Sequence, residues 1–445
     1  MVEKVDTAVV RLWGEDAGAV SWLAERDYAL FEYEPGFLKK GLDISPLYMG
    51  LSAARQGHSI FSFPALNRET FRGLPGLLAD ALPDKFGNAV IDTWLARNGR
   101  DSRAFNPVER LCYSGNRSMG ALEFRPMVSQ GLDSAVPVEI AELARLAQEI
   151  TARRSPLDVS LGNSSKENNE ALKDILRVGT SAGGARPKAV IAINDAGHVL
   201  SGQAGTPPGY EHWILKFDGV SDLELGEPKG YGRIEYAYSL MAGAAGIEMS
   251  ECRLLEEQGR AHFLTRRFDR EAGKKIHMQS LCGLAHYDFN MAGSYGYEQA
   301  FAVMRKLRIS KAEAIQQFRR MIFNVLARNQ DDHTKNIAFL MGKDGKWHLS
   351  PAFDVTCSHN PAGKWTNRHQ MTINGKQDHF QLADLIAVGE GISLPRPEEI
   401  IREIGDAVRQ WPSFAGKAGL SKERIPEIAG YHRLDLSGSR KNSLF

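Results

Sequence analysis

The sequence predicts an α+β fold in which strands and helices are mixed before a mainly helical end. Residues 7 to about 130 combine short strand-like runs with helix-like runs, and an amphipathic helix pattern follows over 138–153. From Asp378 onward the pattern is mostly helical. With 445 residues, of which 43% are hydrophobic and 24% charged, the chain can bury a large core and divide into two or three subdomains.

The bulk properties exclude several classes of protein. No apolar run approaches the roughly 18 residues of a membrane span, and residues 1–6 lack the basic and apolar regions of a secretory signal. We therefore expect a cytoplasmic protein with no membrane partner. The net charge of +1 gives no general attraction to nucleic acid, so binding to DNA would need a local basic patch or a partner protein.

The four cysteines argue against a zinc site and against a disulfide framework. They are scattered through the chain, with no C-x-x-C pair and no close cluster of Cys and His: Cys112, Cys252, Cys282 and Cys357. We expect buried or incidental thiols.

The N-terminal region reads as strands, turns and a helix. Residues 7–13 form a strand pattern, 14–18 a turn, and 20–23 the second strand of a hairpin. A Pro/Gly entry at residues 74–76 leads into a helix-like run through Phe86, Val90 and Trp94. Residues 115–124 read as a glycine-flanked turn that runs into another strand.

A glycine-rich stretch follows a polar connector at residues 155–170. In residues 178–188, the small residues around Gly183 and Gly184 would let the backbone approach a phosphate, and Arg186 and Lys188 would supply positive charge. The stretch is neither G-x-x-x-x-G-K-[ST] nor a strict G-x-G-x-x-G, so an ordinary hairpin turn remains the alternative. It leads into an alternating strand over 188–194.

The next strand carries a lysine among apolar residues. Lys216 ends the run His-Trp-Ile-Leu-Lys, and Glu235 lies on the helix that follows, at about 234–245. Kinases pair a strand lysine with a helix glutamate to hold the lysine against nucleotide phosphates. A lysine that reaches solvent instead is the alternative. Residues 263–270 then read as a strand that leaves toward a hinge.

The last motif is polar and follows a helix over 311–327. Asp331 and Asn336 stand five positions apart, which is the spacing of kinase catalytic loops. A hairpin formed by residues 337–340 and 347–349 would return the chain so that Asp354 faces Asn336.

This spacing fits the needs of phosphoryl transfer. One carboxylate, Asp331, would orient and deprotonate the attacking hydroxyl, and the oxygens of Asn336 and Asp354 would hold Mg2+. Lys335 or Arg328 would supply positive charge near the phosphate. A polar loop without catalytic function is the alternative for this string alone.

Taken in order, the motifs resemble those of the HipA family, the serine/threonine kinase toxins of bacterial type II toxin–antitoxin systems. The resemblance covers nearly the whole chain. The matching motifs are Thr180–Lys188, Trp213–Phe217, Arg267–Arg270, Asn329–Asn336 and Phe353–Asp354.

The resemblance implies a two-lobed protein-kinase-like fold, related to phosphoinositide 3/4-kinases. It implies an N-terminal subdomain over residues 1–130, an ATP-binding lobe over 131–270 and a helical lobe over 271–445. ATP and Mg2+ are the implied cofactors.

The resemblance also assigns roles to individual residues. Asp331 would be the catalytic base, Asn336 and Asp354 the metal ligands, and Ser181 the site of inactivating autophosphorylation. The nucleotide site would be formed by Lys216, Ser181, Gly183, Gly184, Lys188, Glu235, Arg266, Phe268 and His333. Arg266 departs from the family, because an acidic residue is expected at that hinge position.

For biological function, the resemblance implies phosphorylation of an aminoacyl-tRNA synthetase, growth arrest and persistence. A HipB-like helix-turn-helix antitoxin would neutralise the toxin and carry it to DNA. Three alternatives remain open: a catalytically silent co-repressor, a metal-dependent phosphohydrolase built on Asp331, Asp332 and His333, and a small-molecule kinase.

Overall fold

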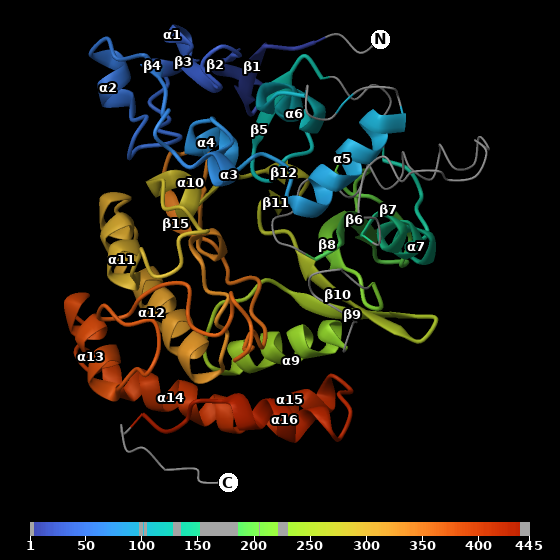
Figure 1. The fold of residues 1–445 in the computed structure, drawn as a ribbon, viewed down its shortest axis with the longest axis vertical. Helices are drawn as coiled ribbons and strands as arrows, with labels where there is room; N and C mark the ends of the chain where they lie inside the picture. The colour runs from blue at the N-terminus through green and yellow to red at the C-terminus, as the bar shows by residue number, and fades with distance from the viewer. Residues whose placement is uncertain are drawn as a thin grey trace. The chain divides into compact units, whose positions relative to one another are not determined.

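The computed structural model describes residues 4–97, 101, 105–127, 135–151, 186–203, 205–220 and 230–436. Strands and helices are mixed along the chain, and the α+β fold class is confirmed (Figure 1). Among the described residues, none of the helices is long and apolar enough to cross a membrane.

The chain divides into two compact units. The first comprises Met1–Gly232, Glu251–His286 and Leu340–Lys346, and the second comprises Arg233–Ser250, Tyr287–Phe339 and Trp347–Phe445. The subdomain boundaries expected near residues 130 and 270 stay a prediction.

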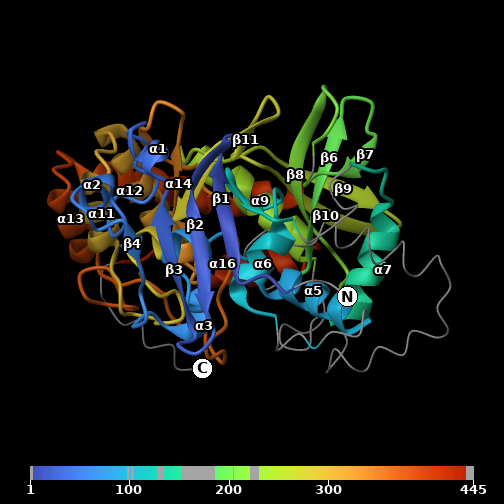
Figure 2. The ribbon, with the colours of Figure 1, turned by 90° about the horizontal axis from the view of Figure 1, so that it is seen from above.

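A five-stranded antiparallel sheet forms the N-terminal part of the first unit. Its order is β4-β3-β2-β1-β5, so its first four strands lie beside their sequence neighbours (Figure 2). In β1, Ala8, Val10 and Leu12 are buried and alternate with less buried residues, which is typical of a sheet with one face on a core. The strands are β1 (Thr7–Leu12), β2 (Glu15–Leu23), β3 (Tyr28–Tyr33), β4 (Ile60–Phe61) and β5 (Leu122–Arg125).

The first hairpin differs from the turn predicted at residues 14–18. The turn is shorter, because only Trp13 and Gly14 lie between β1 and β2, with φ of 50° and 87°. Two central residues with positive φ match the right-handed twist of the flanking strands. Gly18 belongs to β2 instead, where an added Cβ would lie 2.3 Å from the Glu32 carbonyl oxygen. The glycine at this position serves close strand contact.

Short helices surround this sheet and connect it with the rest of the unit. Helix α4 packs against α10, where an added Cβ on Gly76 would lie 2.0 Å from the Gly283 carbonyl oxygen. Asp80 accepts hydrogen bonds from the Ser280 backbone N and hydroxyl, at 2.7 and 2.8 Å, at the start of α10. These helices are α1 (Pro35–Leu38), α2 (Leu51–Arg55), α3 (Arg68–Phe71), α4 (Gly76–Ala79), α6 (Pro107–Ser114) and α10 (Leu281–Ala285).

A second five-stranded antiparallel sheet in the first unit has the order β7-β6-β8-β10-β9. Side chains of α5 (Lys85–Arg97) and α7 (Ile140–Thr151) form one core with this sheet, which includes Val90, Leu143 and Trp213. The predicted strand over 188–194 and the predicted helix near 138–153 are both present. The strands are β6 (Lys188–Asn194), β7 (Val199–Ser201), β8 (Tyr210–Lys216), β9 (Cys252–Glu257) and β10 (Arg260–Arg266), followed by the short β11 (Arg270–Glu271), β12 (Lys274–Lys275) and β13 (His277–Ser280).

The second unit is mainly helical, as expected for the end of the chain. Helix α12 begins with a capping box, in which the Ser310 hydroxyl accepts from the Glu313 backbone N and the Glu313 carboxylate accepts from the Ser310 backbone N. Its apolar face includes Phe318, Ile322 and Val325, all fully buried. The elements that lie wholly or mostly in this unit are α9 (Tyr231–Ala244), α11 (Tyr297–Lys306), α12 (Lys311–Leu326), the 3-10 turn η2 (Thr334–Asn336), β15 (Trp347–Leu349), α13 (Leu382–Gly391), α14 (Pro397–Arg409), α15 (Trp411–Lys417) and α16 (Arg424–Tyr431). Strand β14 (Ala338–Met341) is divided between the two units.

Candidate active site

The end of α12 sets the start of the predicted catalytic loop. Arg328 has φ of 57°, a left-handed conformation that turns the chain out of the helix. The Asn329 backbone N donates to the Asn324 carbonyl at 3.0 Å, and the Arg328 Nε donates to the Tyr431 carbonyl at 2.9 Å. The start of the loop is therefore fixed by one backbone hydrogen bond, from Asn329, and one side-chain hydrogen bond, from Arg328.

Asp331 and Asn336 are brought together, as their spacing predicts. The Asn336 Nδ2 donates to the Asp331 backbone carbonyl at 2.8 Å. Because a carbonyl oxygen only accepts, this bond determines which end of the amide is the nitrogen. The Asn336 Oδ1 is then the amide atom that can coordinate a cation.

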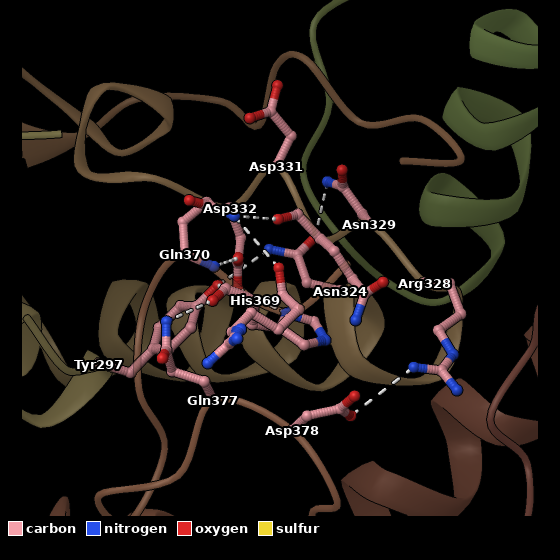
Figure 3. A network of polar contacts seen from close by, with 12 residues as sticks. Tyr297, Asn324, Arg328, Asn329, Asp331, Asp332, His369, Gln370, Gln377 and Asp378 are labelled. Atoms are coloured by element: carbon pink, nitrogen blue, oxygen red, sulfur yellow. Dashed lines mark hydrogen bonds and ion pairs between the residues drawn. The ribbon is translucent and has the colours of Figure 1, made fainter. Parts of the chain in front are cut away.

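The Asp331 carboxylate points away from the buried polar network beside it (Figure 3). Its side chain is 39% exposed, and its Oδ1 accepts from the Trp365 indole Nε1 at 2.5 Å and lies 3.7 Å from the His333 Nε2. Loss of hydration raises the pKa of Asp331 above its usual range, and the neighbouring charges of Asp354 and Asp332 act in the same direction. His333 and the Trp365 hydrogen bond oppose this shift. A carboxylate with a raised pKa is a stronger proton acceptor, which suits a general base.

Asp332, next in sequence, has a structural role. Its Oδ2 accepts from the Tyr297 hydroxyl and the His369 Nδ1, both at 2.9 Å, and its Oδ1 accepts from the Gln370 backbone N at 2.8 Å. Asn324 on α12 donates to the Tyr297 hydroxyl at 3.0 Å, which extends the network to the helix (Figure 3). The carboxylate of Asp332 is therefore buried, and its three hydrogen bonds fix the loop to the surrounding residues.

Asp354 lies after the hairpin of β14 and β15, as predicted. It has φ of 52°, and the chain just before it is held by the Ala352 backbone N, which donates to the Glu248 carbonyl at 2.8 Å. The charge of Asp354 contributes to the raised pKa of Asp331, so the hairpin returns the chain to the loop. Such a left-handed backbone in a non-glycine residue is common at functional sites.

Two of the predicted residues fit a magnesium ion. The Asn336 amide oxygen and the Asp354 carboxylate are hard oxygen donors, and Mg2+ commonly uses one or two protein ligands together with substrate phosphates and water. Within the described ranges, no group of three or more His, Cys, Asp and Glu side chains could hold a metal ion. Asn336 and Asp354 are residues that could hold Mg2+ by the chemistry of their oxygens.

His333 and Lys335 both contact Phe289. The His333 ring centroid lies 5.4 Å from that of Phe289, and the Lys335 Nζ lies 4.6 Å from the same ring centroid. The Thr334 hydroxyl between them donates to the Tyr287 carbonyl at 2.7 Å. The segment that begins at Tyr287 thus packs against the loop at three consecutive residues, His333, Thr334 and Lys335.

In the first unit, Lys188 and Lys216 are direct cross-strand partners on β6 and β8. Opposite residues of an antiparallel pair point to the same face, so the sheet places two positive charges side by side. The Lys188 Nζ lies 3.5 Å from the Asp84 Oδ2, and both side chains are 4% exposed. The Lys216 Nζ lies 5.8 Å from the Phe263 ring centroid. Lys188 is therefore paired with a carboxylate that the sequence analysis did not single out.

The pairing of Lys216 with Glu235 stays a prediction, because the two residues belong to different units. Glu235 itself is 5% exposed on α9. Ser181, Gly183 and Gly184 lie outside the described residues, so the prediction of a phosphate-binding and autophosphorylated loop is also untested.

The expected hinge motif contains one exposed and several buried residues. The Arg266 side chain pairs with the Glu211 carboxylate at 2.8 Å, which places an acidic group beside the position where the family resemblance leads us to expect one. Phe268 follows directly after the end of β10. Asp269 accepts from Arg267 and Arg270, each at 2.7 Å, and all three side chains are nearly or fully buried. The two arginines hold the pKa of Asp269 well below its usual range, despite burial, which acts in the other direction.

This buried cluster joins the two sheets of the first unit. The Gly120 backbone N donates to the Asp269 Oδ2 at 2.7 Å, and Arg270 donates to the Ser118 carbonyl at 3.1 Å. Burial lowers the pKa of Arg270 to about 10, which still leaves it charged at neutral pH. Residues 267–270, which the sequence predicts to be near a hinge, therefore fix the glycine-flanked turn before β5 through hydrogen bonds.

Sequence reasoning missed the residues that hold the catalytic loop. Trp365, His369 and Gln370 lie about thirty positions after the loop, in a segment without regular periodicity. No local pattern marks them, because their partners Asp331 and Asp332 are distant in sequence. The local sign that the sequence offers is a histidine, His369, among polar residues.

Comparison with known proteins gives the family. Residues 8–125 match the HipA N-terminal domain, and residues 180–411 match the HipA-like C-terminal domain. No curated protein sequence matches the chain.

Among solved structures, a HipA protein has the same fold. HipA of Shewanella oneidensis MR-1, in a complex with HipB and operator DNA, matches with a TM-score of 0.66 and 17% identity over 95% of this chain and 94% of that chain. The proinflammatory kinase CtkA of Helicobacter pylori matches with a TM-score of 0.34 and 14% identity over 56% of this chain and 91% of that chain, a similarity too weak to argue from. The fold predicted from the motifs is confirmed by the HipA match, and because the C-terminal domain match alone spans more than half of the sequence, the chain belongs to the HipA family.

Proposed function

We propose that this protein is an ATP-dependent serine/threonine protein kinase and the toxin of a toxin–antitoxin pair. The observation that carries the proposal is the closed loop in which the Asn336 amide bonds to the Asp331 carbonyl. This arrangement leaves a carboxylate for proton transfer and an amide oxygen for a cation, with Asp354 close by, which are the groups that phosphoryl transfer needs. Membership of the HipA family supports the same conclusion.

Each residue would act at a defined step. Asp331 accepts the proton of the acceptor hydroxyl as its oxygen attacks the γ-phosphorus, while the bond from phosphorus to the ADP oxygen breaks. Lys216, whose charge the sheet places opposite Lys188, holds the phosphates of ATP. Asn336 and Asp354 hold Mg2+, which when bound neutralises charge on the phosphates.

Ser181 is the proposed site of self-modification. It lies in the glycine-rich stretch that leads into β6, next to Thr180, a second candidate. A phosphate on this stretch would repel and displace the phosphates of ATP, so modification would inactivate the enzyme.

The proposed partner is a small HipB-like helix-turn-helix antitoxin. The Shewanella HipA structure is a complex with HipB and operator DNA, and this supports an antitoxin partner for a chain with the same fold. With a net charge of +1, the protein would reach DNA mainly through that antitoxin. An aminoacyl-tRNA synthetase in the cytoplasm is the proposed substrate, and its phosphorylation would arrest growth and cause persistence.

The experiment that tests the proposal is intact-mass spectrometry of the purified protein before and after incubation with Mg-ATP. We expect a gain of one phosphate, which peptide mapping should place on Ser181 or Thr180. Asp331→Asn should abolish this gain and keep ATP binding, because it removes the base and leaves the lysines in place. Asp406→Asn is the matched control, since Asp406 is 62% exposed on α14 and should leave the gain unchanged.

The alternative, a catalytically silent co-repressor, gives a different outcome. An unmodified protein that binds ATP but never gains or transfers phosphate, even to a set of purified aminoacyl-tRNA synthetases, would overturn the kinase proposal. Loss of the gain in Ser181→Ala alone would assign the modified residue.

A further inference from the structure

The two oxygens of the Asp331 carboxylate have unequal surroundings. Oδ1 accepts from the Trp365 indole Nε1 at 2.5 Å and lies 3.7 Å from the His333 Nε2. In the described part of the second unit, no hydrogen bond or ion pair involves Oδ2. One oxygen is therefore engaged by the protein, and the other is available to an acceptor hydroxyl.

Trp365 is itself held by the segment that anchors the loop. Its carbonyl oxygen accepts from the Gln370 Nε2 at 2.6 Å. The Gln370 backbone N donates to the Asp332 Oδ1 at 2.8 Å, so residues 365–370 bind both aspartates of the loop. We name this segment, residues 365–370, the strap.

The strap is anchored in the core of the second unit. The His369 Nδ1 lies 2.9 Å from the Asp332 Oδ2, and the two side chains are 0% and 1% exposed. Tyr297 and Asn324 extend the same network to α11 and α12 (Figure 3). The donor that Trp365 offers to Asp331 therefore comes from a buried, hydrogen-bonded support and not from a loose loop.

Resting on the proposed function, we propose that Trp365 is a positioning residue for phosphoryl transfer: its indole N–H holds Oδ1 of Asp331 and thereby directs Oδ2 toward the acceptor hydroxyl. The acceptor oxygen forms a bond to the γ-phosphorus, the bond to ADP breaks, and the proton of the hydroxyl goes to Oδ2. An unrestrained aspartate side chain on a loop would rotate about its χ angles and present its oxygens in several directions. A fixed direction matters because small displacements of a catalytic group reduce the rate strongly.

The activity test compares two tryptophan variants of the second unit. Trp365→Phe removes the indole N–H and keeps an aromatic ring at the site. Trp411→Phe is the matched control, because the Trp411 Nε1 donates to the Ile425 carbonyl at 2.9 Å, away from the catalytic loop. Each variant loses one indole hydrogen bond.

We expect the rate of phosphate transfer at saturating Mg-ATP to fall about tenfold in Trp365→Phe, a fraction of what a general base contributes. The KM for ATP should change less than about twofold, because Trp365 acts on the base and not on the nucleotide. Trp411→Phe should keep both values, whatever it does to thermal stability. Equal losses in both variants, or a change confined to the KM for ATP, would overturn the proposal.

A double-mutant cycle tests whether the effect passes through Asp331. Trp365→Phe should have no further effect on whatever rate remains in Asp331→Asn, since the amide has no basic oxygen for the indole contact to direct toward the acceptor hydroxyl. Additive losses would mean that Trp365 acts elsewhere.

A readout that needs no activity separates this inference from the proposed function. In a TROSY spectrum of 15N-tryptophan protein, the resonance missing from Trp365→Phe identifies the indole N–H of Trp365. We expect slow exchange of this proton with water and a clear shift in Asp331→Asn. If the wild-type protein transfers no phosphate, the kinase proposal fails. The spectrum then still shows whether the Trp365 indole N–H contacts Asp331. A fast-exchanging proton that does not respond to Asp331→Asn would refute the positioning role.

Discussion

The His369 Nδ1 donates to the Asp332 Oδ2 at 2.9 Å, in a site where neither side chain reaches solvent. This contact ties a segment without regular secondary structure to the loop that carries Asp331. It also explains why the loop has a second aspartate, which the proposed catalytic role of Asp331 does not require. The second aspartate of the Asp-Asp pair is the group by which the loop is fastened to the core.

Asp332→Ala should therefore destabilise the second unit. It leaves the Tyr297 hydroxyl, the His369 ring and the Gln370 backbone N without their shared acceptor, and each unsatisfied buried donor costs about 1–3 kcal/mol. We expect a loss of about 3 kcal/mol in the free energy of unfolding, measured by urea denaturation.

Asp406→Ala is the control for this change. Asp406 pairs with Arg409 on the surface of α14, and an exposed pair of this kind contributes less than about 1 kcal/mol. Similar losses in the two variants would contradict the anchoring role of Asp332.

The ion pair of Asp84 and Lys188 gives a second prediction, this time in the first unit. Both side chains are 4% exposed, so Asp84→Leu would leave a buried ammonium without this partner and should cost about 3–5 kcal/mol. The double variant Asp84→Leu, Lys188→Met removes both charges and should recover most of that loss. A double variant that is as unstable as the sum of the single variants would show that the two charges do not depend on each other. Urea denaturation of all four proteins measures this coupling.

The buried His277 should make the free energy of unfolding depend on pH. Burial lowers the pKa of His277 from its usual 6.5 to about 4, and its Nε2 lies 3.0 Å from the Ile44 carbonyl. The unfolded chain binds a proton near pH 6.5, while the folded protein does not until about pH 4. The contribution of His277 is therefore complete above pH 6.5 and is lost as the pH falls toward 4.

In this window His277 alone should reduce the free energy of unfolding by up to about 1.4 kcal/mol per pH unit. His277→Gln, which keeps a donor for the Ile44 carbonyl, should reduce the slope of stability against pH between pH 6 and 4.5. Chemical denaturation across this range measures both slopes. A variant with the slope of wild type would mean that His277 is already protonated in the folded protein.

The contact of α4 with α10 gives the last prediction. An added Cβ on Gly76 would lie 2.0 Å from the Gly283 carbonyl oxygen, which is backbone and cannot rotate away. Gly76→Ala should therefore cost at least about 1–3 kcal/mol through forced separation of the helices. Gly416→Ala on α15 meets no atom within 4 Å and should be neutral or stabilising by up to about 1 kcal/mol. Thermal denaturation of both variants distinguishes steric crowding from the general effect of replacing glycine.

Local patterns predicted the elements near the site well. The alternating run Lys188–Asn194 is β6, and the apolar period of residues 311–327 is α12 to within one residue. The spacing of Asp331 and Asn336 predicted that they meet, and a hydrogen bond joins them. The prediction of a turn over residues 14–18 is wrong, because Gly18 lies in β2 and permits a close approach between strands. From the sequence alone, a glycine in a turn cannot be told from a glycine that permits close contact between two strands.

The sequence by itself determined the α+β class, the order of strands and helices around the site, the loop that carries Asp331 and Asn336, and the resemblance to the HipA family. The elements and the loop are encoded over a few neighbouring residues, so periodicity and spacing reveal them, whereas the family follows from the resemblance of the ordered motifs. Only the tertiary structure decided that Trp365 donates a hydrogen bond to Asp331, that the buried Asp332 contacts His369, and that Asp84 pairs with Lys188. Each of these contacts joins residues more than thirty positions apart, and which partner a side chain meets at that range depends on how the whole chain packs.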